Sequence, residues 1–291
     1  MNDAAAPPVI RQIADMKDSL SPKSRIIGNF IIRNPNKAVF MTIKKLAKAC
    51  NVSEASVVRF VAALGYNGYS EFLQALKEVV NTGMTLPDRA DMSGISDIGL
   101  DRLQHVLLEE IDNIKYLYET IDMEKINRLV AYIDGAKNVF ITGSRLSYTF
   151  AYYFGWSLTK IMKGVQILKG SDSTAIDMIS TAPADSLVVL FATTRYPNEL
   201  IRLSRLVRRL NLSLLVITDS HISPVIQFAD LSVVIPSKSI PFIGNVANMA
   251  CVIQYIIEAL AGKKGKALQA HQEQLEQVYL ENDILFNLLP K

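Results

Sequence analysis

Six polar residues between positions 44 and 59 are of the types that contact nucleic acid: Lys44, Lys45, Ser53, Glu54, Ser56 and Arg59. Arginine can bind a guanine edge through two hydrogen bonds or clamp a phosphate, and we expect this of Arg59. The lysines would hold the phosphate backbone without reading sequence. The serine hydroxyls, near a helix start, could bind phosphate oxygens or base edges. Glu54 could accept from a cytosine amino group, or it could only stabilise its helix start.

The residues between these side chains predict the two helices that would hold them. The segment 42–65 reads TIKKLAKACNVSEASVVRFVAALG. Ala47 is small enough for two helices to approach, Asn51 suits the left-handed backbone of a tight turn, and Ser53 can cap the second helix. Apolar residues recur at the spacing that buries them, at Val52, Val57 and Phe60. The segment therefore predicts a DNA-binding helix-turn-helix. The alternative is an ordinary helix pair with solvated charges.

Charge and composition divide the chain. Residues 1–80 hold eleven Lys/Arg and six Asp/Glu, which gives a net charge of +5. The remaining residues hold twenty Lys/Arg and twenty-two Asp/Glu, which gives a net charge of −2. A basic segment beside an acidic one suggests that only the first faces a polyanion. With 291 residues, 49% of them hydrophobic, the chain can fold two domains. We expect a helical DNA-binding domain at 1–80, a linker at 81–101, a ligand-binding domain at 102–262 and a helical tail at 263–291.

Beyond residue 136 the pattern changes to that of a parallel sheet. Continuous apolar runs, typical of strands buried on both faces, occur at 138–143, 187–192 and 213–219, with further candidate strands at 165–168 and 231–235. Amphipathic segments alternate with them at 147–163 and 197–210, a helix is expected over 102–133, and a long helix follows at 245–262. The fold class expected is an all-α helix-turn-helix domain followed by a three-layer αβα domain.

Two loops of this second domain contain hydroxyl and guanidinium groups. They follow the strands at 138–143 and 187–192, and open α/β sheets bind ligands at the carboxyl ends of their strands. The candidate ligand residues are Ser144, Arg145, Ser147, Thr193, Thr194 and Arg195. A helix start after each loop would favour an anion there. Weaker candidates are Ser171, Ser173, Thr174 and Asn245. Ordinary strand-to-helix turns capped by Ser and Thr are the alternative.

The stretch NVSEASVVRFVAALGYNGYSEF at 51–72 resembles the N-terminal domain of RpiR-type regulators. Those proteins carry a C-terminal SIS (sugar isomerase) domain, so the resemblance implies a dimeric or tetrameric regulator of carbohydrate-metabolism genes. SIS loops usually read G-x-G-x-S and S-x-S-G-x-T-x-E, with hydroxyls that hold a sugar phosphate. Here Arg145 and Arg195 stand at glycine positions, while Ser147 and Thr194 keep their hydroxyls. The effector implied is a phosphosugar or another anion, unless the site is lost.

Other features limit the function classes. The segment MNDAAAPPVIRQ shows no export signal and no apolar run could span a bilayer, so we expect a cytoplasmic protein without membrane contact. The three histidines have no ligand spacing, and we expect neither a metal nor a cofactor. Cys50 and Cys251 are expected to be buried free thiols.

Two alternatives to a regulator remain open. The first is a sugar-phosphate isomerase with an accessory helical domain. We do not expect an enzyme, because Glu199 is the only carboxylate near the predicted loops and no histidine is there to act as an acid or base. The second is a DNA- or RNA-binding protein whose second domain only dimerises.

Overall fold

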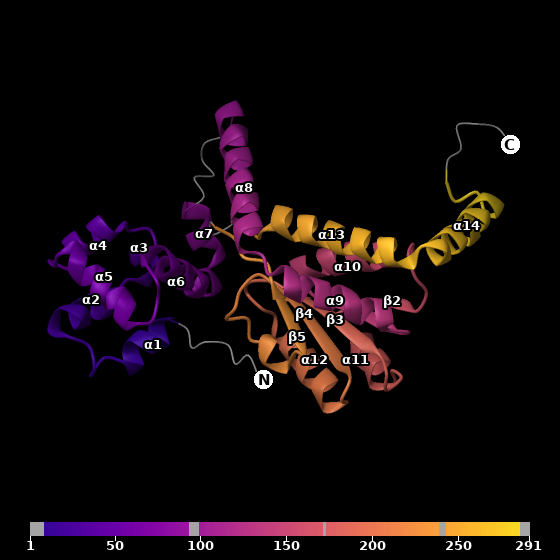
Figure 1. Cartoon of the computed structure of the whole chain (residues 1–291), viewed down its shortest axis with the longest axis horizontal. Helices are drawn as coiled ribbons and strands as arrows, with labels where there is room; N and C mark the ends of the chain where they lie inside the picture. The colour runs from indigo at the N-terminus through magenta and orange to yellow at the C-terminus, as the bar shows by residue number, and fades with distance from the viewer. Residues whose placement is uncertain (1–8, 93–98, 171–172, 239–242, 286–291) are drawn as a thin grey trace. The chain divides into compact units, whose positions relative to one another are not determined.

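The computed structural model describes residues 9–92, 99–170, 173–238 and 243–285 (Figure 1). They form two compact units, each described here by itself. The first takes its residues from 1–113, 220–222 and 237–244, and the second holds the rest. Within the described ranges, no helix has the length and apolar character needed to cross a membrane.

The first unit is helical, as predicted. Its helices are α1 (Val9–Asp15), α2 (Pro22–Arg33), α3 (Pro35–Ala38), α4 (Ile43–Ala49), α5 (Glu54–Ala63), α6 (Tyr69–Gly83) and α7 (Leu86–Met92), followed by the start of α8 (Leu100–Thr120). Ser21 caps α2 by accepting from the backbone N–H of Ser24, and α2 ends before the Asn34–Pro35 pair. The core is built from fully buried side chains of α2, α5 and α6, among them Ile27, Ile31, Val57, Phe60, Phe72 and Leu76.

The second unit contains the predicted parallel sheet. Its strands are β1 (Val139–Gly143), β2 (Val165–Lys169), β3 (Leu187–Ala192), β4 (Ser213–Thr218) and β5 (Leu231–Val234), in the order β2-β1-β3-β4-β5. All four pairings are parallel, and Ile141 of β1 lies between Ile167 and Val189. All five predicted strand segments are therefore confirmed.

Helices cover both faces of this sheet, which explains why its central strands are apolar throughout. On one face, α9 (Met123–Gly135), α10 (Leu146–Leu158) and α13 (Val246–Lys264) pack against side chains such as Ile141 and Val189. On the other, α11 (Ser173–Ser180) and α12 (Asn198–Arg209) pack against side chains such as Phe140 and Val188 (Figure 1). The sheet thus forms the middle layer of three.

Two details differ from the sequence expectations. The helix expected over 102–133 is two helices, α8 and α9, because Asp122 caps a new helix by accepting from the N–H of Lys125 at 3.0 Å. Cys50 is buried as expected, but Cys251 is exposed, because it lies on the side of α13 that faces away from the sheet. The prediction that both thiols are buried is therefore wrong for Cys251.

The C-terminal segment forms α14 (Lys266–Glu281), which follows Gly265 with its positive φ of 48°. It contacts the end of α10 within the same chain. A ring nitrogen of His271 lies 2.9 Å from the carbonyl oxygen of Thr159, and the Lys160 ammonium donates to the Tyr279 hydroxyl at 2.5 Å. These contacts hold α14 against the end of α10 within the second unit.

Candidate functional site

The turn between α4 and α5 has the geometry that the sequence predicts. Asn51 has a φ of 52°, in the left-handed region that Asn tolerates better than most residues. The next N–H, of Val52, donates to the carbonyl of Ala47 at 2.9 Å, and Ala47 is itself buried. Asn51 therefore sets the angle at which α5 leaves α4, while Val57 and Phe60 fix α5 in the core.

Five of the six predicted nucleic-acid residues are exposed around this turn. Lys44 and Lys45 lie on α4, Ser53 caps α5, and Glu54 and Arg59 lie on α5 itself. Ser53 accepts from the N–H of Ser56 at 3.3 Å, so its hydroxyl marks the helix start. The positive end of α5 and two lysines of α4 thus face solvent in one short segment.

Ser56 departs from the prediction, because its side chain is only 3% exposed. Its hydroxyl lies 2.9 Å from that of Ser53 and accepts from a guanidinium nitrogen of Arg59 at 3.3 Å. Ser56 therefore does not lie with the five exposed candidates. It lies four positions before the buried Phe60, on the inner side of α5. Its hydroxyl is placed to orient the Arg59 side chain.

Val58 is a surface residue that the sequence analysis did not single out. Its side chain is 54% exposed on α5, next in sequence to the fully buried Val57. An exposed methyl group on a helix of this type can contact the methyl group of a thymine. The helical repeat of the sequence could have identified Val58 as a surface residue, because it lies four positions after Glu54 and next to Arg59.

The two predicted ligand loops meet at one place in the second unit. They follow β1 and β3, which are adjacent in the order β2-β1-β3-β4-β5, so the loops flank the point where the strand order reverses. Open α/β sheets bind ligands outside the carboxyl ends of their strands at this switch point. Of the six candidates, three are buried (Ser144, Ser147, Thr193), Thr194 is partly buried, and Arg145 and Arg195 are exposed.

Hydrogen bonds already connect the two loops. The Ser147 and Thr193 hydroxyls lie 3.0 Å apart, and the N–H of Thr193 donates to the Ser147 hydroxyl at 3.0 Å. The Ser144 hydroxyl donates to the Glu199 carboxylate at 2.6 Å. This bond is the main reason why the pKa of Glu199 is lowered; its own backbone N–H, Arg202 and Arg145 act in the same direction. Glu199 is therefore ionised near neutral pH.

Asp219, which follows β4, is a site residue that the sequence analysis missed. It accepts from the N–H of Thr194 at 2.8 Å, from the Thr194 hydroxyl, and from the Tyr196 hydroxyl at 3.0 Å. Burial raises the pKa of Asp219, and these hydrogen bonds oppose the rise. The expectation that Glu199 is the only carboxylate near the loops is therefore wrong. Its position at the end of the next predicted strand could have identified Asp219 as a site residue.

Both arginines have backbone conformations that favour glycine. Arg145 has a φ of 55° and Arg195 a φ of 71°. A non-glycine residue at positive φ is uncommon and costs about 1–3 kcal/mol, and such residues cluster at functional sites. Gly143 has a separate reason to be glycine, because a Cβ there would collide with the carbonyl of Ser147. Each loop thus holds an arginine in a conformation that costs it free energy.

The weaker candidates lie apart from these hydrogen bonds. Ser173 and Thr174 are exposed at the start of α11, and Ser171 lies outside the described residues. Asn245 caps α13 by accepting from the N–H of Asn248 at 3.3 Å, and its own buried amide nitrogen has no partner in the described part of the chain. The same part of the chain holds no cluster of three or more His, Cys, Asp or Glu side chains that could bind a metal.

Comparison with known domains and relatives agrees with this architecture. Residues 8–83 match the helix-turn-helix domain of the rpiR family, and residues 132–259 match the SIS domain. An uncharacterized HTH-type transcriptional regulator of Haemophilus influenzae is 22% identical over 95% of this chain and 98% of its own length. The bifunctional protein glk of Paraburkholderia xenovorans is 24% identical over 73% of this chain, which spans only 33% of that protein.

The fold is also found in a solved structure. The Vibrio vulnificus NanR protein, complexed with ManNAc-6P, superposes with a TM-score of 0.54 at 18% identity. The superposition covers 96% of this chain and all of that one. At this identity, the likeness establishes the shared fold.

Proposed function

Because this chain belongs to the RpiR family of transcriptional regulators, with a helix-turn-helix domain joined to a SIS domain, we propose that it binds operator DNA under the control of an anionic sugar derivative. Lys44, Lys45, Ser53, Glu54 and Arg59 would contact the DNA. The observation that carries the DNA-binding part is the turn at Asn51, which leaves the start of α5 exposed beside two lysines. A regulator of chromosomal genes would act in the cytoplasm.

The effector would bind at the switch point between β1 and β3. The exposed guanidinium groups of Arg145 and Arg195 supply donors for a phosphate or carboxylate. Ser144 and Thr194 each donate their single hydroxyl proton to a carboxylate, so toward a ligand they present lone pairs. We therefore expect the anionic end of the ligand at the arginines and its hydroxyl groups at the serines and threonines. The complex of NanR with ManNAc-6P supports a phosphosugar as the first ligand to test.

The regulator would act as a homodimer or homotetramer, since two recognition helices would match a pseudo-palindromic site. An effector changes the affinity for DNA only if it binds unequally to two arrangements of the protein, one with high and one with low affinity for DNA. Selection of DNA from a random library by the full-length chain would supply the operator. Fluorescence anisotropy with that DNA should then change when ManNAc-6P or another sugar phosphate is added. Failure to enrich any sequence would refute the DNA-reading role.

Sugar-phosphate isomerisation is the second candidate. It is favoured by one observation, that two carboxylates near the loops have pKa values shifted in opposite directions, Glu199 down and Asp219 up. Against it, both carboxylates are engaged by neighbouring hydroxyl groups. Incubation of the chain with aldose and ketose phosphates, followed by NMR, distinguishes an isomerase from a ligand-sensing regulator. Turnover would favour the enzyme, whereas a thermal shift without turnover would favour the sensor.

A further inference from the structure

Arginine makes up most of the outer face of α12. Arg202, Arg205 and Arg209 follow one another at spacings of three and four residues, within about 60° of each other around the helix. All three are exposed, and the opposite side of α12 is buried through Leu200, Leu203, Ser204 and Val207. The column extends for about 10 Å along the helix. It therefore points away from the sheet over its whole length.

This positive charge contrasts with the rest of the domain. α12 holds four arginines and one glutamate, a net +3, whereas residues 81–291 as a whole have a net charge of −2. Without α12, that part of the chain would have sixteen basic and twenty-one acidic residues, or −5. A solvated helix needs no such excess of one sign. The helix is thus a local basic surface on an acidic background.

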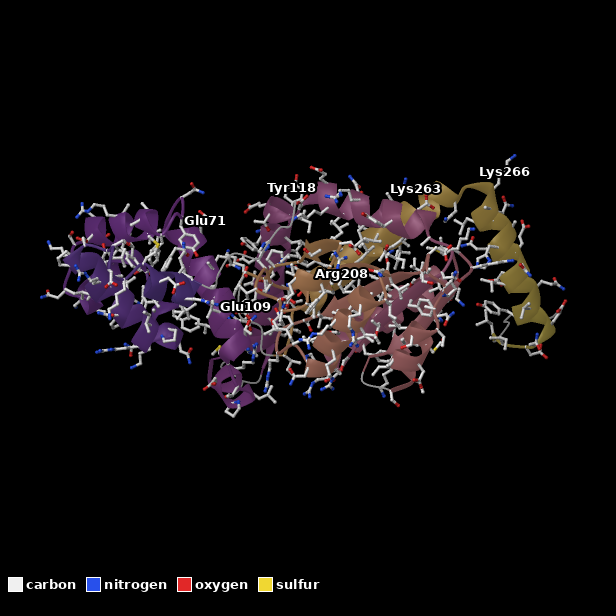
Figure 2. All side chains as sticks on the ribbon, turned by 90° about the horizontal axis from the view of Figure 1, so that it is seen from below. Glu71, Glu109, Tyr118, Arg208, Lys263 and Lys266 are labelled. Carbon is white, nitrogen blue, oxygen red and sulfur yellow. The ribbon has the colours of Figure 1, made fainter. Side chains whose placement is uncertain are left out.

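Neighbouring groups hold two of the guanidinium groups in place. Arg208, labelled in Figure 2, donates to the Asp230 carboxylate at 2.8 Å. The Arg205 guanidinium lies over the ring of Phe228, 5.9 Å from its centroid. Glu199 lies near enough to Arg202 for that arginine to help lower its pKa. After these contacts the column remains exposed, and Arg209 and the outer edges of Arg202 and Arg205 can still donate.

We propose that the Arg202–Arg205–Arg209 column is a second DNA-contacting surface, which binds the phosphate backbone of a DNA duplex. Planar guanidinium groups match phosphate oxygens in pairs, and the column contains no lysine. Its donors would add affinity and salt dependence without reading sequence. The inference rests on the proposed DNA-binding function.

The test needs no known operator, because non-specific DNA binding is almost wholly electrostatic. Full-length wild type and the triple variant Arg202→Gln, Arg205→Gln, Arg209→Gln would be titrated onto fluorescent 16- and 60-base-pair duplexes of mixed sequence between 50 and 300 mM KCl. The matched control is Arg128→Gln, Lys263→Gln, Lys266→Gln, which removes three exposed charges from α9, α13 and α14 (the two lysines are labelled in Figure 2). Circular dichroism would check that both variants are folded.

Each lost phosphate contact should reduce the slope of log K against log salt by about 0.9. We expect the α12 variant to reduce the slope on the longer duplex by about two to three, and the affinity at 100 mM KCl at least tenfold. The control should change neither appreciably. Equal effects of both variants, or no effect of the α12 variant, would overturn the inference. A wild type that binds neither duplex would instead refute the DNA-binding function itself.

Discussion

The hydroxyl of Ser144 donates to the carboxylate of Glu199 at 2.6 Å and so ties the loop after β1 to the first turn of α12. The two residues are 55 positions apart, and Ser144 is almost fully buried. The bond uses the only proton that the hydroxyl can donate. A ligand that needs a donor at this point must therefore compete with an internal carboxylate.

Replacement of Ser144 by Ala should lower the free energy of unfolding at pH 7 by about 1 kcal/mol, because a buried hydrogen bond to a charged group is lost. A lowered carboxyl pKa stabilises the fold above the ordinary value of 4.5, and this stabilisation is lost as the pH falls through the folded value. The difference between wild type and Ser144→Ala should therefore shrink from pH 7 to pH 4. Urea unfolding at both pH values measures it. Thr149→Ala, at an exposed position of α10, is the control.

Asp219 should have the opposite pH dependence. Burial raises its pKa, so between the ordinary value of 3.8 and the higher folded value the native state binds more protons than the unfolded chain. The contribution of Asp219 to stability is then largest at low pH and declines as the pH rises. Asp219→Asn cannot titrate, so its stability relative to wild type should increase from pH 4 to pH 7.5 in urea unfolding. Parallel profiles would contradict this, and the exposed Asp185→Asn provides the baseline.

Arg145 and Arg195 lie at positive φ, so each Arg→Gly substitution should raise the free energy of unfolding by about 1 kcal/mol. The relieved strain, of about 1–3 kcal/mol, exceeds the extra entropic cost of folding a glycine, of about 0.5–1 kcal/mol. Arg→Ala at the same positions keeps the Cβ and should give no such gain, which makes it the matched control. Both substitutions should weaken the binding of a sugar phosphate in calorimetry. A glycine variant that is less stable than its alanine counterpart would contradict the strain argument.

Arg59→Ala should weaken binding to a selected operator by about 1–3 kcal/mol, with little change in folding, because the residue is exposed. Ser56→Ala should cause a smaller loss, because it frees Arg59 from its hydrogen bond without removing the guanidinium. Anisotropy titrations would measure both. Arg11→Ala, on α1, is the control for the loss of an exposed charge. If Ser56→Ala weakened binding more than Arg59→Ala, the orienting role of Ser56 would be wrong.

Sequence periodicity was sufficient for most of the fold. The strands were predictable because burial on both faces leaves continuous apolar runs, as in LVVLFA at 187–192. The turn at Asn51 was predictable because few residue types tolerate a left-handed backbone. Both signals are local, so no knowledge of distant parts of the chain was needed.

The site was less predictable because its contacts join distant segments. Asp219 meets Thr194 across 25 positions, and neither local sequence indicates the other. Ser56 lies four positions before the buried Phe60, so the helical repeat places it on the inner side of α5, where its hydroxyl pairs with that of Ser53. The residue type of Arg145 does not indicate its glycine-like conformation, which only the resemblance to SIS loops suggested and the backbone shows.

The separation of buried and exposed positions on α5 has a practical consequence for protein engineering. Its inner positions, such as Val57 and Phe60, hold the helix, while Glu54, Ala55, Val58 and Arg59 face outward. A library that randomises only these four outer codons would leave the hydrophobic core untouched. If α5 reads DNA as proposed, such a library would allow new operator preferences to be selected while the second domain is left unchanged.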